Sequence, residues 1–182
     1  MLLSIYIYYS HDIGYVQGQA FLGGMFLLNL DLFDSFVCFT NLLNRRYFQC
    51  LYRFKSIDQY FQLLKDLLCV HLPKLNEHFS KMSIEINCFA LDWLFTMFSK
   101  SLPLDIVVRI WDLILRDGEK MIFRTAIGIL SIFEEDLCRL DTFYCLQYLT
   151  RLPENVDEKK LFDAIEKIQL RRTDSNLYHL IA

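Results

Sequence analysis

The stretch from Asp12 to Gly18 holds the residues whose types and spacing could take part in chemistry. It reads Asp-Ile-Gly-Tyr-Val-Gln-Gly and stands where a loop is expected to lead into an apolar helix. At a helix start, a glutamine next to glycine can hold its amide away from the surface, where it accepts one hydrogen bond from water and donates another. Glutamine does this in phosphoryl transfer, where it orients the attacking water. Gln17 is therefore a candidate water-positioning residue, and a glutamine that only caps the helix is the alternative.

Histidine and cysteine give weaker candidates. His71 and His78 form the only close histidine pair, and no cysteine or carboxylate completes a ligand set beside them, so we expect surface or core histidines and no metal. The six cysteines contain no CxxC pair, which favours reduced core residues: Cys38, Cys50, Cys69, Cys88, Cys138 and Cys145. A helical enzyme with a Cys-His nucleophile pair stays open, because such partners meet only in the fold. Gly23-Gly24 lacks the spacing of a phosphate loop, and close helix packing explains it better.

The composition of the 182-residue chain indicates one folded domain. Hydrophobic residues make up 54% of the chain, far more than a disordered segment carries. The formal net charge is −3 and Lys and Arg do not cluster, so nucleic acid is a poor candidate partner. No run approaches the ~20 apolar residues that span a membrane. Residues 1–9 lack the basic start and cleavage site of a signal peptide, so we expect a cytoplasmic protein.

An all-helical fold is expected, because apolar residues recur mainly at intervals of three and four, and only three Pro and six Gly occur. Residues 86–98 give the clearest pattern, with apolar side chains on both faces, as in a helix at the centre of a domain. The next helix begins near Pro103 and stops at Gly118. Further helices are predicted at residues 16–29, 32–44, 57–70 (with a capping box of Ser56 and Gln59), 74–81, 119–139, 142–150 and 158–170, before a polar tail from Arg171.

The run Gly14-Tyr15-Val16-Gln17-Gly18 resembles the YxQ motif of the TBC domain, the all-helical family of Rab GTPase-activating proteins. Other sequence segments agree with that family in order and spacing: Leu91-Asp92-Trp93-Leu94-Phe95 with Phe98-Ser99, Leu102-Pro103, Arg109-Ile110-Trp111-Asp112 with Asp117-Gly118, and Phe123-Arg124-Thr125-Ala126-Ile127-Gly128-Ile129-Leu130. The resemblance covers residues from about 3 to 170. Residues 100–118 are most similar to a subfamily implicated in recycling endosomes and autophagosome formation.

The resemblance implies a multi-helix TBC-type domain of two packed helical lobes that activates a GTP-bound Rab and is not itself the enzyme. In this family, an Arg from an IxxDxxR motif and the Gln of YxQ reach into the Rab nucleotide site in trans. The Arg offsets charge on the phosphoryl oxygens, and the Gln aligns the water. Gln17 matches the second role, and Tyr15, expected to be the more buried, would set the loop that presents it. No cofactor is implied. We expect a monomer that associates with endosome, Golgi or autophagosome membranes only through its Rab.

Two departures from the family pattern bear on this activity. The sequence contains neither an IxxDxxR nor an upstream RxxxW motif, and residues 3–9 resemble the helix that precedes YxQ. We therefore expect one TBC domain truncated at its N-terminus, with lobes at about 1–90 and 91–170, divided near 82–100, and a tail at 171–182. Such a chain should stimulate Rab GTP hydrolysis weakly or not at all, and a binding-only Rab scaffold is the alternative. Gln19 stands where Met is usual and is expected to alter the loop.

The other matched residues are expected to serve the structure. Trp93 and Trp111 fall on apolar helix faces and should be core residues. Arg109, Asp112 and Arg124 should hold helices together through ion pairs or bonds to helix ends. Two pairs four residues apart have the acid first, the favoured orientation on a helix: Asp105 with Arg109, and Asp112 with Arg116.

Overall fold

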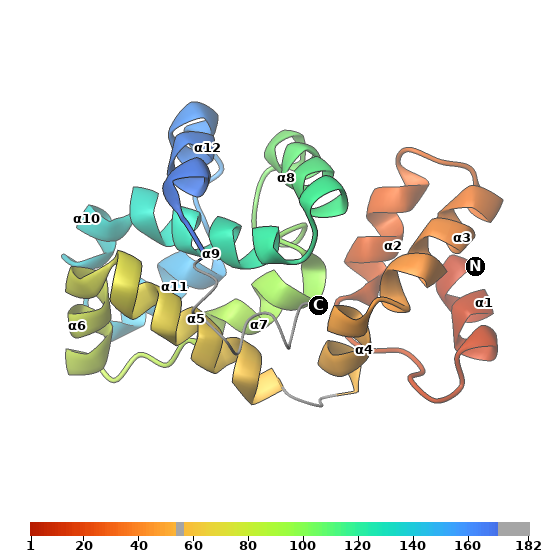
Figure 1. The fold of residues 1–182 in the computed structure, drawn as a ribbon, viewed down its shortest axis with the longest axis horizontal. Helices are drawn as coiled ribbons and strands as arrows, with labels where there is room; N and C mark the ends of the chain where they lie inside the picture. Colours follow the sequence, from red (N-terminus) through yellow and green to blue (C-terminus); the bar gives the residue numbers. More distant parts are fainter. Residues whose placement is uncertain (54–56, 171–182) are drawn as a thin grey trace.

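The computed structural model describes residues 1–53 and 57–170, which form helices joined by loops (Figure 1). The helices are α1 (Leu2–Tyr9), α2 (Gln19–Leu27), α3 (Leu32–Leu43), α4 (Arg46–Tyr52), α5 (Ile57–His71), α6 (Pro73–Lys81), α7 (Asn87–Thr96), α8 (Leu104–Asp117), α9 (Lys120–Ile132), α10 (Glu134–Leu137), α11 (Thr142–Thr150) and α12 (Glu158–Lys167). Because the described residues contain no strand, the all-helical prediction is confirmed. The capping box at Ser56 and the tail from Arg171 lie outside the described residues.

Aspartates mark the start of three helices. The Asp31 carboxylate accepts a hydrogen bond from the Asp34 N–H at the start of α3, with a separation of 2.9 Å. Asp141 and Asp157 do the same at the starts of α11 and α12. Each cap satisfies a backbone donor that has no partner inside its helix, and such a cap contributes ~1 kcal/mol.

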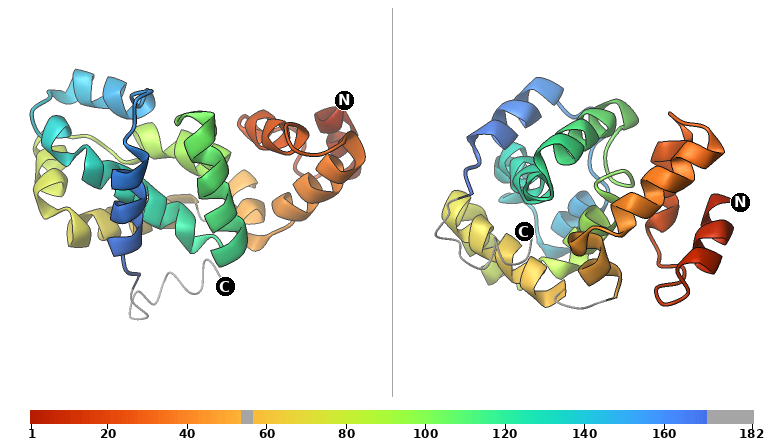
Figure 2. Two further views of the ribbon diagram at one scale, coloured as in Figure 1. Left: turned by 90° about the horizontal axis from the view of Figure 1, so that it is seen from above. Right: turned by 45° about the vertical axis from the view of Figure 1, so that its right-hand side comes forward.

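The helices form two neighbouring groups, with α7 between them (Figure 1). Helices α1 to α4 gather near the N-terminus, and α5, α6 and α9 to α12 lie on the other side. Figure 2 shows α9 in the middle of the second group, where it contacts α5, α8 and α12. Helix α7 contacts α2 on one side and α9 and α11 on the other. The lobe boundaries expected from the sequence stay a prediction.

Helix α7 is buried on most sides, as its sequence predicts. The Trp93 side chain is fully buried and its ring lies 5.0 Å from that of Phe89, edge to face. Leu91 and Cys88 are the exceptions among the apolar residues of α7, because both side chains are exposed. In the N-terminal group, a Cβ on Gly23 would lie 3.3 Å from the Leu2 side chain, so close packing of α2 on α1 does explain this glycine.

Helix α7 is shorter than the predicted range 86–98, because it ends at Thr96. Met97 and Phe98 follow in left-handed conformations, with φ of 47° and 66°, although both side chains are fully buried. A left-handed residue with a side chain costs about 1–2 kcal/mol, and burial of a large apolar side chain contributes a similar amount. The apolar spacing therefore predicted the burial of these residues correctly, but it did not predict their backbone conformation.

Two other predicted helices differ from the structure, and one helix was not predicted. The predicted helix at 16–29 begins only at Gln19. The predicted helix at 119–139 divides into α9 and α10 at Phe133, whose backbone leaves helical geometry while its ring packs 5.3 Å from Tyr148. Helix α4 was missed, because its start carries no side-chain cap and it spans only 7 residues.

Candidate functional site

Gln17 lies at the corner of a turn that Val16 and Gln19 close from both ends. The Gln19 N–H donates to the Val16 carbonyl, and the Val16 N–H donates to Oε1 of Gln19, each with a separation of 3.2 Å. Gln17 and Gly18 are thus the central residues of a hydrogen-bonded four-residue turn. Gly18 has a φ of 108°, and the second central residue of a type II turn requires such a positive φ. The Gln17 side chain is exposed just before α2, as predicted.

Gly18 rests on the C-terminal end of α7. A Cβ on Gly18 would lie 3.2 Å from the Cβ of Phe95 and 3.4 Å from the Phe95 carbonyl oxygen. The position therefore combines a backbone conformation that favours glycine with a contact so tight that a Cβ would require Phe95 to shift. The turn that carries Gln17 is held against α7 by this contact.

The end of α7 is itself anchored by buried donors. The last carbonyls of a helix have no partner within the helix. Three side chains donate to carbonyls here: the Tyr47 hydroxyl to Leu94 (3.4 Å), the Tyr52 hydroxyl to Phe95 (2.7 Å) and the Trp111 indole N–H to Met97 (3.1 Å). Burial raises the pKa of both tyrosine hydroxyls well above the usual value, so they remain neutral donors. The turn thus rests on a rigid base.

The upstream part of the loop is tied to the end of α4. The Asp12 carboxylate accepts a hydrogen bond from the Ser10 hydroxyl at 3.1 Å and forms an ion pair with Arg53. The Arg53 Nε also donates to Oε1 of Gln49 at 3.0 Å. The Ser10 hydroxyl and the Arg53 guanidinium lower the pKa of Asp12. Since both charged groups are exposed, this ion pair adds little to global stability, but it connects the loop to α4.

Tyr15 lies at the surface beside Gln17. Its side chain is 52% exposed and Gln17 is exposed as well, so the expectation that Tyr15 is the more buried of the two stays a prediction. The neighbouring Val16 is partly buried instead and packs against the core. The contacts that hold the turn come from Gln19 and Gly18, and a supporting role for Tyr15 stays a prediction.

Gln19 has a larger part in the loop than the sequence analysis assigned to it. Its side chain is fully buried, with Oε1 bonded to Val16. Among the described residues, its Nε2 has no hydrogen-bond partner. This bond lies before α2, whose N-cap is Gly18, so it is not a capping box, and no helix-start pattern in the sequence predicted it.

Comparison with known proteins identifies the family to which this fold and turn belong. The Rab-GTPase-TBC domain, RabGAP-TBC, matches residues 1–138, which include the turn and α7. The chain belongs to the RabGAP-TBC family. The resemblance seen in the YxQ run is therefore confirmed.

Relatives and solved structures agree with this assignment. TBC1 domain family member 14 of Mus musculus is 43% identical over 175 residues, which cover 93% of this chain and 25% of that protein. TBC1 domain family member 12 of Xenopus tropicalis is 40% identical over 178 residues, which cover 95% of this chain and 26% of that protein. The chain thus spans about a quarter of the length of these relatives.

Two solved structures share the fold. The Chlamydomonas flagellar RabGAP TBC domain has a TM-score of 0.80 and 26% identity, with 91% of this chain and 57% of that chain covered. The Ypt/Rab-GAP domain of Gyp1p has the same TM-score of 0.80 at 18% identity, with 97% and 64% covered, so this match supports the fold alone.

The tryptophans of this TBC domain have the structural role predicted for them. The Trp93 and Trp111 side chains are both buried.

Arg124 donates from Nη2 to the carbonyls of Ile165 (2.8 Å) and Glu166 (2.9 Å), and so binds the end of α12 to α9. The prediction that Arg124 holds helices together is confirmed.

The two predicted ion pairs along α8 are wrong. Arg109 pairs instead with Glu158 at the start of α12, and its guanidinium lies 4.6 Å from the centre of the Phe162 ring. Arg116 pairs with the adjacent Asp117. Arg109 reaches beyond its own helix and Arg116 pairs within α8 with the next residue, so the four-residue spacing did not determine their partners. Arg109 still joins two helices as expected, whereas Asp112 is exposed.

Histidine and cysteine do not assemble into a site in the described part of this TBC domain. His71 ends α5, whereas His78 lies in α6, where its Nε2 is 3.1 Å from the Leu140 carbonyl oxygen. The six cysteines are free thiols; Cys145 is buried, but Cys69 and Cys88 are exposed, so the core prediction is wrong for these two. Residues 1–53 and 57–170 contain no group of three or more His, Cys, Asp or Glu that could hold a metal ion.

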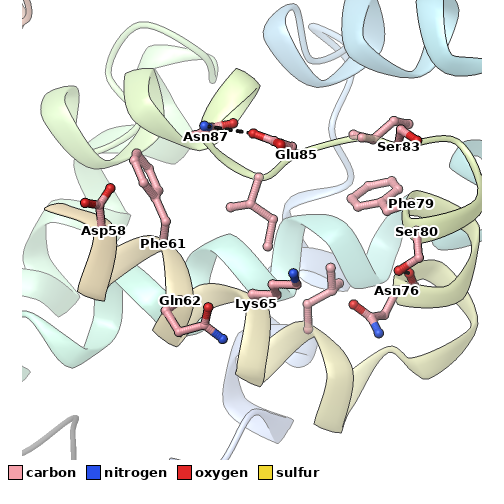
Figure 3. A pocket seen from close by; sticks show the side chains of 13 residues that line it. Asp58, Phe61, Gln62, Lys65, Asn76, Phe79, Ser80, Ser83, Glu85 and Asn87 are labelled. Carbon is pink, nitrogen blue, oxygen red and sulfur yellow. Dashed lines mark hydrogen bonds between the residues drawn. The ribbon is translucent and has the colours of Figure 1, made fainter.

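A groove of about 530 Å³ lies between α5, α6 and the start of α7 (Figure 3). Phe61 and Phe79 line it together with polar side chains that include Lys65 and Asn76, and Glu85 accepts a hydrogen bond from Asn87 at its edge. No cysteine or histidine lines this groove, so it does not support the helical enzyme with a Cys-His pair.

None of the helices in residues 1–53 and 57–170 is both long and apolar enough to cross a membrane.

Proposed function

We propose that this chain is a GTPase-activating domain for Rab-family GTPases in their GTP-bound form, with Gln17 supplied in trans. The observation that supports this proposal is the exposed Gln17 at the corner of an anchored turn, in a chain of the RabGAP-TBC family. A residue that acts in the active site of a partner must project from a rigid base. The contact of Gly18 with Phe95 supplies such a base.

Gln17 would act on the attacking water and not on the phosphate bond itself. Its side-chain carbonyl oxygen would accept a hydrogen bond from the water, and its NH2 group would donate one to an acceptor in the nucleotide site. This arrangement holds the water in line with the bond that breaks. The role requires neither a change in the charge of Gln17 nor a cofactor in this chain.

The cationic half of the family mechanism has no matching residue in this sequence, which contains no IxxDxxR motif. An arginine that offsets charge on the transferring phosphoryl group is worth ~10³–10⁵ in rate. Arg45 already pairs with Glu119 at 3.4 Å, so its charge is partly compensated. We therefore propose that the chain stimulates GTP hydrolysis weakly or not at all.

A Rab-binding scaffold is the second candidate function, and the missing motif favours it. Such a scaffold would dock on the GTP-bound Rab without accelerating hydrolysis. In both cases, the protein would act as a monomer in the cytoplasm and reach endosome, Golgi or autophagosome membranes through its Rab, where it would regulate vesicle traffic.

Binding to a panel of Rabs tests the proposal. Each Rab is loaded with a non-hydrolysable GTP analogue or with GDP, and binding of the chain is measured by interferometry. We expect at least one Rab to bind more tightly in the GTP form, because Gln17 must reach the site of the γ-phosphate. Gln147→Ala, which changes an exposed glutamine on α11 far from Gln17 in the sequence, should bind as the parent does. A chain that binds no Rab in a GTP-dependent way would contradict both candidate functions.

A further inference from the structure

We propose that Gln19 is a positioning residue for Gln17, an inference that rests on the proposed function. The two residues lie on either side of Gly18, but only Gln17 faces solvent, whereas Gln19 is fully buried. Gln19 thus acts on the reaction from beneath the turn, by fixing the backbone from which Gln17 projects.

The hydrogen bonds of Gln19 carry this inference. Its backbone N–H donates to the Val16 carbonyl, and its side-chain Oε1 accepts from the Val16 N–H, each at 3.2 Å. One residue therefore satisfies both backbone groups of Val16, the residue directly before Gln17. Without Oε1, the partly buried N–H of Val16 would lose this acceptor, and the peptide unit between Tyr15 and Val16 would be held less firmly.

Packing alone does not explain a glutamine at this position. The Gln19 side chain is fully buried, and among the described residues its Nε2 makes no hydrogen bond. A buried amide that lacks a partner is unfavourable, so an apolar side chain of the same size would fill the site at lower cost. The bond from Val16 to Oε1 is the contact that requires the glutamine.

Gln17 is thereby held from two directions. On its C-terminal side, Gly18 is fixed by its contact with Phe95. On its N-terminal side, Val16 is fixed by Gln19. Because both neighbours are held, Gln17 presents its amide in a narrow range of directions, and the entropy lost when the water is aligned is reduced. Loss of the Gln19 bond should therefore lower the rate of the chemical step and leave Rab binding unchanged.

The test compares Gln19→Met with the parent and with Gln147→Met, which makes the same change on the exposed face of α11. Methionine has a similar length but no acceptor oxygen. By amide hydrogen exchange, we expect the Val16 N–H to exchange about 3- to 10-fold faster in Q19M, as the loss of one hydrogen bond predicts. The amide of Ile127 in the core of α9 should exchange as in the parent. An unchanged Val16 rate would overturn the proposal, and so would equal acceleration at Ile127, because that would indicate general destabilisation.

Kinetics then separate positioning from a structural role. For a Rab that responds to the parent, Q19M should lower kcat by about 3- to 10-fold with KM unchanged. In the Gln17→Ala background, Q19M should have no further effect, because Gln19 acts through Gln17. Effects that add in the double variant would overturn the proposal. If the parent activates no Rab, an outcome that the proposed function allows, Val16 exchange decides whether Gln19 holds the turn, and an unchanged Val16 rate overturns the proposal.

Discussion

Gly18 and Phe95 lie so close together that a Cβ added to Gly18 would be 3.2 Å from the Cβ of Phe95. The two residues are far apart in the sequence, yet this contact joins the turn that carries Gln17 to the end of α7. Since Tyr52 donates to the Phe95 carbonyl at 2.7 Å, the same residue links the turn to α4 as well. The position of Gln17 therefore depends on packing between three elements.

Gly18→Ala should destabilise the protein by about 1–3 kcal/mol, because alanine suits neither the φ of 108° nor the space beside Phe95. For a chain of this length, each kcal/mol lowers Tm by roughly 2–4 °C. Thermal unfolding followed by circular dichroism measures the change. Gly14→Ala is the control, since Gly14 also has a positive φ of 65° but no atom lies within 4 Å of its Cβ position. A loss in Gly14→Ala as large as that in Gly18→Ala would show that the Phe95 contact is unimportant.

Gly128→Ala should destabilise the contact between α9 and α12. An added Cβ would lie 2.7 Å from Cγ1 of Ile165 and 3.3 Å from its backbone N, so the helices must move apart, at a cost of about 1–3 kcal/mol. Gly24→Ala in α2 should instead raise the free energy of unfolding by about 0.5–1 kcal/mol, because no atom lies within 4 Å of the added Cβ and alanine favours the helix. Urea unfolding measures the change in the free energy of unfolding for both variants. A change in the same direction for both would count against the described packing.

The loop beside Gln17 should respond to pH through Asp12. Its pKa lies below the usual value of 3.8, chiefly because it accepts a hydrogen bond from Ser10, with Arg53 acting in the same direction. A lowered carboxyl pKa in the folded state stabilises the loop above the unfolded-state pKa, and this contribution disappears as the pH falls through the folded-state pKa. Carboxyl NMR titration should show a higher Asp12 pKa in Ser10→Ala and in Arg53→Met. An Asp12 pKa that neither variant raises would refute these contacts.

The cysteines should differ in reactivity toward iodoacetamide. Cys69 and Cys88 are exposed and should be alkylated in the folded protein. Cys145 is buried, and burial raises its pKa to about 11, so little thiolate forms at neutral pH. Mass spectrometry of peptides after a timed reaction should find Cys145 labelled last, and labelling it in urea supplies the control. Equal rates at Cys145 and Cys88 in the folded state would contradict the burial of Cys145.

The sequence predicted those features that depend on local pattern. Apolar spacing identified α7 as a central helix, and the YxQ run identified Gln17 as an exposed residue before a helix. The anchoring of Gly18 was not predicted, because it depends on a positive φ and on a contact with Phe95 that no local pattern contains.

Partners of long polar side chains were also beyond sequence reasoning. Arg109 pairs with Glu158 on another helix, although Asp105 lies nearer to it in the sequence, four residues earlier in α8. Arg53 likewise reaches Asp12 from the end of α4. The bond between Gln19 and Val16 was not predicted either, because it lies outside the helix-start positions at which a capping box forms.

Single-turnover GTP hydrolysis by a panel of Rabs, with the parent chain and with Gln17→Ala, tests the central claim most directly. Because Gln17 is exposed, its substitution should leave the fold and its stability unchanged. The account predicts that the parent raises the rate far less than the ~10³–10⁵-fold that a catalytic arginine supplies, and that Gln17→Ala abolishes any increase. Stimulation that persists in Gln17→Ala would contradict the role of Gln17. Full-size stimulation by the parent would show that another cation, such as Arg45 or Arg46, supplies the missing charge.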